Sequence, residues 1–205
     1  MLNRSTRYLL VAIQALIAWE WLVSGINKLL SGMFPQMLPD TLNDGIKGNP
    51  NGWYVSFLQS VVLPHSLFFG YLIEWGELAI GILLLAGAIL LLRRQRMRGE
   101  SQYGIVLGFY AVVAVAALVG AFFCVNFHFW AGHGLIPGLN GAPGDEGVDL
   151  DALVPPLSLV ITLANIALIA QLRGSSWLSK LLGEYQDANK QNETDATSVK
   201  QALVS

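Results

Sequence analysis

Residues 67–92 read LFFGYLIEWGELAIGILLLAGAILLL, a run in which only Glu74 and Glu77 carry charge. A helix needs roughly 20 consecutive apolar residues to cross the hydrocarbon core of a bilayer. This stretch is long enough to span a membrane. The two carboxylates inside it need a partner or a function, because ionisable groups are costly in hydrocarbon.

Three more stretches of the chain are comparably apolar, at residues 8–30, 103–127 and 153–172. Only 13% of the 205 residues are charged and 54% are hydrophobic, whereas soluble domains carry about a quarter charged residues. We therefore predict an all-α fold, an integral membrane four-helix bundle over residues 1–183, followed by a polar cytoplasmic tail over residues 184–205. We expect the first span to be retained, because its apolar run is too long for a signal peptide.

The basic residues predict the orientation of the bundle, because Lys and Arg in short loops mark the cytoplasmic side. The predicted loop between the first two spans carries only Lys47, and the loop between the last two carries no Lys or Arg. Basic residues instead cluster at the opposite ends of the spans: Arg4, Arg7, Arg93, Arg94, Arg96, Arg98, Arg173 and Lys180. We predict a multi-pass protein of the cell membrane with both termini cytoplasmic.

The two long loops differ in composition. Residues 31–66 are rich in Pro, Gly and Asn, and we expect one short helix there, lying on the outer membrane surface around the aromatic residues 53–58. Residues 131–155 are dominated by Gly and Pro, and we expect no regular element in them.

Polar residues within the spans are candidates for a functional site. The ionisable ones are Glu20 and Lys28 in the first span and Glu74 and Glu77 in the second. The uncharged ones include Ser24, Asn126, Ser158, Thr162 and Asn165. With ~1.5 Å of rise per residue, the topology brings most of these groups into the outer half of the bilayer, with Asn165 at a depth similar to Glu20 and Glu77.

Helical spacing groups these side chains further. Glu20, Ser24 and Lys28 follow one another at i, i+4 and i+8 and share a face, while Glu74 and Glu77 are i, i+3 neighbours. Asn126 and His128 cannot share a face, and we favour Asn126 as the member of the cluster. Three helices are thus expected to present polar faces inward at one depth.

Two interpretations of this cluster remain open. One is a buried ion-pair network that fixes helix packing, with Lys28 neutralising Glu74 or Glu20. The other is a site that exchanges protons or binds the polar head of a ligand, because three carboxylates exceed one lysine and some of them must bind protons.

Other cofactor chemistries receive little support from the sequence. Cys124 is the only cysteine, so the chain has no dithiol for thiol exchange. We find no flavin, haem or iron–sulfur motif, and three scattered histidines do not make a zinc site. No metal is therefore expected, and nucleic acid is not an expected partner.

Two short motifs resemble the DoxX family of four-helix membrane proteins. Residues 24–28, SGINK, resemble its Gly-x-x-Lys element, and residues 74–81, EWGELAIG, resemble its Glu-x-x-x-Gly element. The resemblance covers roughly residues 8–130. It implies the four-helix fold, directs attention to Gly25, Lys28, Glu77 and Gly81, and suggests a quinone-linked role, because the family includes DoxD, a subunit of a thiosulfate:quinone oxidoreductase.

The leading hypothesis is a membrane subunit of a quinone-linked electron-transfer system. Glu20, Glu74 and Glu77 would exchange protons and Lys28 would stabilise anionic oxygen. The polar residues expected to help hold the quinone head are Ser24, Gly25, Asn126 and Asn165. Electrons would come from a substrate or from another membrane or periplasmic subunit. The alternatives are a non-catalytic accessory or scaffold subunit of a larger complex and, more weakly, a carrier for a small anion.

The orientation can be tested with cysteine substitutions at Lys47, Arg96, Asp145 and Lys190. In intact cells an impermeant thiol reagent should label positions 47 and 145, and should not label positions 96 and 190, because only the first two are predicted outside. Labelling at position 96 without labelling at position 145 would show that the true orientation is the opposite of the predicted one.

Overall fold

The computed structural model describes residues 4–93, 100–133 and 153–174, with the side chains of residues 100–103 excluded. The polar tail predicted for residues 184–205 and the acidic stretch at residues 145–151 lie outside these ranges. The described part is helical, and four of its helices are long and apolar enough to cross a membrane. The prediction of four membrane-spanning helices is confirmed, and these helices define the chain as a multi-pass helical membrane protein.

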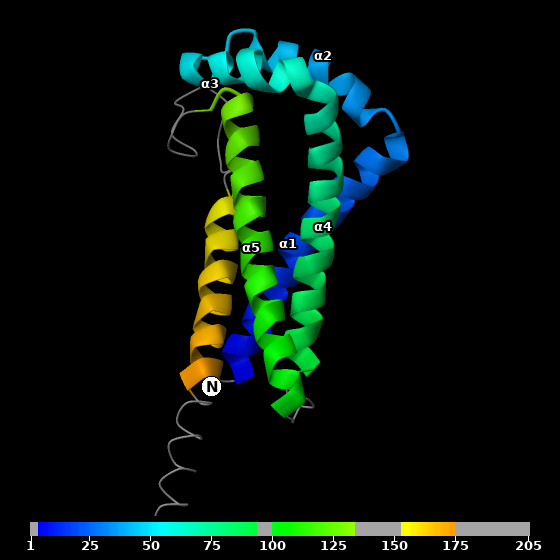
Figure 1. Ribbon diagram of the computed structural model, residues 1–205. Helices are drawn as coiled ribbons and strands as arrows, with labels where there is room; N and C mark the ends of the chain where they lie inside the picture. The colour runs from blue at the N-terminus through cyan, green and yellow to red at the C-terminus, as the bar shows by residue number, and fades with distance from the viewer. Residues whose placement is uncertain (1–3, 94–99, 134–152, 175–205) are drawn as a thin grey trace, which may run out of the picture. The chain divides into compact units, whose positions relative to one another are not determined.

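The spanning helices are α1 (Arg4–Ser31), α4 (Ser66–Arg93), α5 (Glu100–Trp130) and an unlabelled fourth helix (Leu153–Gly174). Each contains the corresponding apolar stretch with a few residues added at its ends. Residues up to Ile166 form one compact unit, and the arrangement described below is that of this unit. Figure 1 shows α1 beginning and α4 ending at one end of the bundle, away from α2 and α3.

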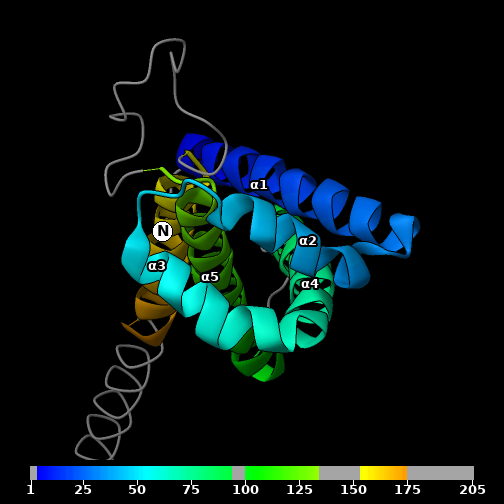
Figure 2. The same ribbon diagram turned by 90° about the horizontal axis from the view of Figure 1, so that it is seen from above.

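The segment between α1 and α4 is helical throughout most of its length, whereas the sequence predicts one short helix around residues 53–58 within a loop. It contains α2 (Phe34–Ile46), α3 (Gly52–Phe57), a π-helical turn (Leu58–Val62) and a 3-10 turn (Leu63–His65). We call residues 34–65 the cap. In Figure 2, α2 runs from the end of α1 back over the bundle toward α5, and the segment from α3 to His65 returns toward α4.

Helix α2 forms despite two prolines. Pro35 lies in the first turn, where its missing N–H has no intrahelical partner to lose. Phe34, Leu38, Leu42 and Ile46 recur every four residues and belong to an apolar cluster with Tyr54, Leu58 and Val62. Burial of this stripe offsets the hydrogen bond that Pro39 removes inside the helix. The prediction was right for the short helix near residues 53–58, which is α3, and wrong for residues 34–46, where it gave Pro and Gly more weight than the four-residue period.

The cap is fastened to the end of α5 by asparagine side chains. Asn49 Nδ2 donates to the backbone oxygens of Phe129 at 2.9 Å and Trp130 at 3.0 Å, and Asn51 Nδ2 donates to the oxygen of His133 at 2.9 Å. Carbonyls at a helix C-terminus lack intrahelical partners. The cap therefore supplies the donors that terminate α5.

Helices α1 and α4 approach each other closely at two reciprocal glycines. A Cβ atom built on Gly25 would lie 2.7 Å from the backbone nitrogen of Leu78, and one built on Gly81 would lie 2.8 Å from that of Leu22. Both distances are shorter than van der Waals contact. Small residues at such crossings allow backbones to pack directly against each other, which is a main source of helix association in membranes.

This packing predicts the effect of adding a single methyl group. Gly25→Ala should lower the free energy of unfolding by roughly 1–3 kcal/mol, because the backbone of α4 cannot move without disturbing its other contacts. Gly108→Ala on α5 is the matched control, since no atom lies within 4 Å of a Cβ built there. Thermal melting in detergent should show a lowered midpoint for Gly25→Ala only. Equal midpoints for the two variants would contradict the close packing.

Candidate functional site

A polar cluster occupies the contact between α1 and α4, close to the cap. Lys28 Nζ lies 2.7 Å from Glu77 Oε2 in an ion pair, and also donates to Ser24 Oγ at 2.7 Å. Ser24 Oγ in turn donates to the same Glu77 oxygen at 2.8 Å. The glycine contact explains this geometry, because Lys28 follows Gly25 and Glu77 precedes Gly81 by about one helical turn on the facing surfaces.

The two partners of the ion pair differ in burial. The side chain of Glu77 is 1% exposed and that of Lys28 is 21% exposed. The second carboxylate oxygen of Glu77, Oε1, is buried and has no hydrogen-bond partner among the described residues. An unpaired buried oxygen on an acid is costly, and it can accept a ligand or a proton. Several other buried polar atoms of the described residues also have no partner, among them Gln14 Oε1, Ser158 Oγ and Asn165 Oδ1.

The cluster forms part of the wall of a cavity of about 380 Å³. This volume is near the lower end of the range of about 300–1,000 Å³ that is typical of small-molecule sites. Helix α1 contributes Glu20, Ser24 and Lys28, as their spacing predicts. The other polar lining residues are Thr41, Tyr54, Glu77 and Asn126.

The rest of the cavity wall is apolar and largely aromatic. It includes Trp21, Phe34, Phe57, Phe69, Phe122, Phe123, Phe127 and Trp130. Trp21 and Phe123 meet edge to face with their ring centroids 6.2 Å apart. The ammonium group of Lys28 lies 5.2 Å from the ring centroid of Phe34 in the cap, within the range of a cation–π contact. The cavity thus combines one polar end with apolar walls.

The cap contributes a hydrogen bond at this site. Tyr54 Oη donates to the backbone oxygen of Asn126 on α5 at 2.9 Å and lies 3.3 Å from the side-chain oxygen Oδ1. Asn126 Nδ2 donates to the backbone oxygen of Phe122 at 2.7 Å. Asn126 lines the cavity as expected, whereas His128 is buried and stacks on His133 with ring centroids 4.8 Å apart.

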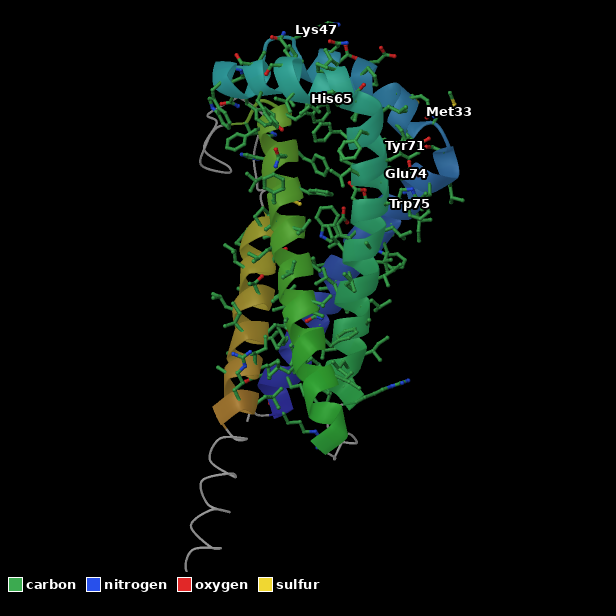
Figure 3. All side chains as sticks on the ribbon, viewed as in Figure 1. Met33, Lys47, His65, Tyr71, Glu74 and Trp75 are labelled. Atoms are coloured by element: carbon green, nitrogen blue, oxygen red, sulfur yellow. The ribbon has the colours of Figure 1, made fainter. Side chains whose placement is uncertain are left out.

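Three of the expected site residues, Glu74, Asn165 and Gly25, do not line the cavity. Glu74 is buried on α4 with its Oε2 unpartnered among the described residues, but it does not line the cavity. Figure 3 shows Glu74 between Tyr71 and Trp75 on the half of α4 nearest the cap. Asn165 is also buried away from the cavity, and its Nδ2 donates to the oxygen of Ile161. Gly25 does not line it either, and acts instead through the α1–α4 contact.

The fourth spanning helix contributes packing rather than polar groups. Only Val154 of this helix lines the cavity. Thr162 Oγ1 lies 3.3 Å from the backbone oxygen of Ala114 on α5 and 2.9 Å from that of Ser158. The polar side chains of this helix, Ser158, Thr162 and Asn165, are buried in the bundle but do not line the cavity.

The residues that sequence analysis missed are those of the cap. Thr41 and Tyr54 bring hydroxyl groups to the cavity, and Phe34 covers Lys28. The four-residue period from Phe34 to Ile46 was the signal that could have located α2. Among the described residues, no group of three or more His, Cys, Asp or Glu side chains is arranged to hold a metal ion.

Comparison with protein-family models, with curated proteins and with solved structures finds no match to this chain. The similarity to DoxX proteins therefore rests on the motif residues themselves. Of these, Lys28 and Glu77 form the ion pair, and Gly25 and Gly81 form the close helix contact.

The Tyr54 hydrogen bond can be tested by Tyr54→Phe. This variant should lose about 1 kcal/mol of stability, because a buried backbone carbonyl on α5 loses its donor from the cap. Tyr71→Phe is the control, since Tyr71 is exposed on the surface of α4. Thermal melting of both variants should show a shift for position 54 alone, and an unshifted Tyr54→Phe would contradict the fastening of the cap to α5.

Proposed function

We propose that this chain is a membrane subunit of a quinone-linked electron-transfer system, and that the cavity holds the quinone head. The observation that carries the proposal is the unpaired, buried Glu77 Oε1 beside a lysine at the polar end of an aromatic-lined cavity. The DoxX-like motifs support the same interpretation, because their Lys and Glu are the two charged partners of this pair.

The residues present fit such a group. A quinone is a flat ring with polar oxygens and an apolar tail, and when bound it would supply the capacity to take up electrons and protons together. Lys28 would hold negative charge on an oxygen of the head. Glu77, and Glu20 on the same wall, would exchange protons with it. The aromatic side chains would exclude water from the ring. Glu74 and Asn165 are not part of the proposed site, because they do not line the cavity.

The electrons would come from a substrate or from a partner subunit. The proposal includes a cell-membrane location with both termini cytoplasmic and the cap outside. It is supported by the basic residues: the cap carries only Lys47, while Arg4, Arg7 and Arg93 lie at the other end of the bundle. Partner membrane or periplasmic subunits would then reach the cap side.

A non-catalytic accessory or scaffold subunit is the second candidate function. It is favoured by the position of the Lys28–Glu77 pair, which lies directly beside the Gly25–Gly81 contact and can stabilise the crossing of α1 and α4. In that case the pair would contribute to folding only, and removal of one partner would leave an uncompensated buried charge.

The variant Glu77→Gln separates the two functions. The amide keeps the shape of the side chain but cannot exchange a proton. Under the proposed function, quinone reduction in membranes that contain the chain should fall by a factor on the order of 100, with little change in thermal stability. Under the structural function, stability should drop by roughly 3 kcal/mol or more.

Two further variants complete this experiment. Adding Lys28→Met to Glu77→Gln removes the unpaired cation, so it should restore lost stability but not lost turnover. Glu74→Gln is the matched control, a buried carboxylate of the same helix outside the cavity, and it should keep normal turnover. Recovery of both turnover and stability in the double variant would refute a proton-exchanging role for Glu77.

A further inference from the structure

The cavity is open on the side of the bundle that faces lipid. Two of its lining residues, Leu72 on α4 and Phe122 on α5, are 46% and 63% exposed. Both lie on apolar surfaces of spanning helices, where the surrounding medium is hydrocarbon. Figures 1 and 2 show that α4 and α5 diverge toward the cap. A ligand therefore has access to the cavity from within the membrane, between these two helices.

A second hollow lies along the same two helices. It is a groove of about 420 Å³, lined by Gly76, Ala79, Ile80, Leu83, Ala111, Val112, Val115, Ala116 and Val119. Every lining residue is apolar or glycine. No polar group in the groove could hold the head of a ligand, so its chemistry suits a hydrocarbon chain.

Helical spacing aligns the groove with the opening of the cavity. On α4, Leu72, Gly76, Ala79 and Leu83 are separated by four, three and four residues, and therefore share one face. The corresponding residues on α5 are separated by four, four and three residues and also share one face: Ala111, Val115, Val119 and Phe122. The edge of the cavity is therefore one helical turn from the start of the groove on both helices.

Phe123 forms the boundary between the two hollows. It lines the cavity, and its ring edge would lie 2.9 Å from a Cβ atom built on Gly76, which lines the groove. The ring packs against the glycine because no side chain occupies that position. One partly buried aromatic side chain thus lines the cavity and packs against a glycine of the groove.

We infer that the ligand of the cavity is a long-tailed amphiphile drawn from the leaflet on the cap side, and that its tail lies in the groove between α4 and α5. This inference rests on the proposed function, in which the ligand is a quinone with its head at Lys28 and Glu77. A cavity of about 380 Å³ holds a ring and little of a long tail. The tail leaves past Leu72 and Phe122 and follows the apolar stripe.

Tail placement can be measured directly with a photoreactive probe. The probe is a ubiquinone analogue whose ten-carbon tail ends in a diazirine, added to the full-length protein in lipid nanodiscs. Irradiation should attach it to residues of the groove, in the segments 76–83 and 111–119. An excess of untagged decyl-ubiquinone should abolish this labelling. An equal excess of a plain fatty alcohol should not, because the head anchors the probe.

Two variants provide the structural control. Ala79→Phe fills the groove from an exposed position and should cause loss of the competed labelling at segments 76–83 and 111–119. Ala12→Phe makes the same change at an exposed position of α1 and should leave the labelling unchanged. Binding of tail-less ubiquinone ring, followed by quenching of the fluorescence of Trp21 and Trp130 in the cavity wall, should be the same in both variants.

Several outcomes would overturn the inference. Competed labelling on α1 or on the cap would place the tail elsewhere. A disulfide-linked dimer of Ala79→Cys would assign the groove to a helix of a second copy. In both cases the tail-less ring would still bind, and the proposed function would stand. If neither the tail-less ring nor decyl-ubiquinone binds, the proposed quinone function is refuted, and so is the placement of the tail in the groove.

Discussion

The close contact of α1 and α4 at Gly25 and Gly81 is the constraint on which the polar features of this protein depend. In a membrane, lipid tails are as apolar as leucine, so helices associate through close packing and interhelical polar contacts. The two glycines bring the backbones together with Leu22 and Leu78 as their partners. Lys28 and Glu77 then face each other across the crossing at 2.7 Å, and each compensates the charge of the other.

Polar groups inside the bundle fall into two kinds. Gln14 donates to the oxygen of Leu84 at 2.8 Å, and Thr162 and Asn165 bond to backbone oxygens of nearby turns. These groups have backbone partners, as the bilayer requires of buried polar atoms. Glu77 differs in its partners, because one of its oxygens accepts hydrogen bonds from the ammonium of Lys28 and the hydroxyl of Ser24. Its charged partner and its place in the cavity wall distinguish Glu77 from Gln14, Thr162 and Asn165.

The cap helps to separate the charged part of the cavity wall from its apolar part. Its buried apolar stripe covers the bundle end, Phe34 lies against the ammonium of Lys28, and Tyr54 bonds to α5. The charged groups Glu20, Lys28 and Glu77 lie on the α1–α4 wall, while the α4–α5 side keeps exposed apolar edges at Leu72 and Phe122. A molecule with one polar end and one apolar end matches this division, whereas a small hydrophilic anion would meet mostly aromatic walls and excess carboxylate.

The sequence by itself determined the four spanning helices, because a run of about 20 apolar residues has few other stable forms in water or lipid. Spacing also determined that Glu20, Ser24 and Lys28 share a face, since the period of a helix is fixed. Only the tertiary structure decided that Lys28 pairs with Glu77 and that Glu74 and Asn165 are excluded from the cavity. Those outcomes depend on the rotation and crossing of neighbouring helices. For α1 and α4 the steric contacts at Gly25 and Gly81 set both, and no local periodicity encodes them.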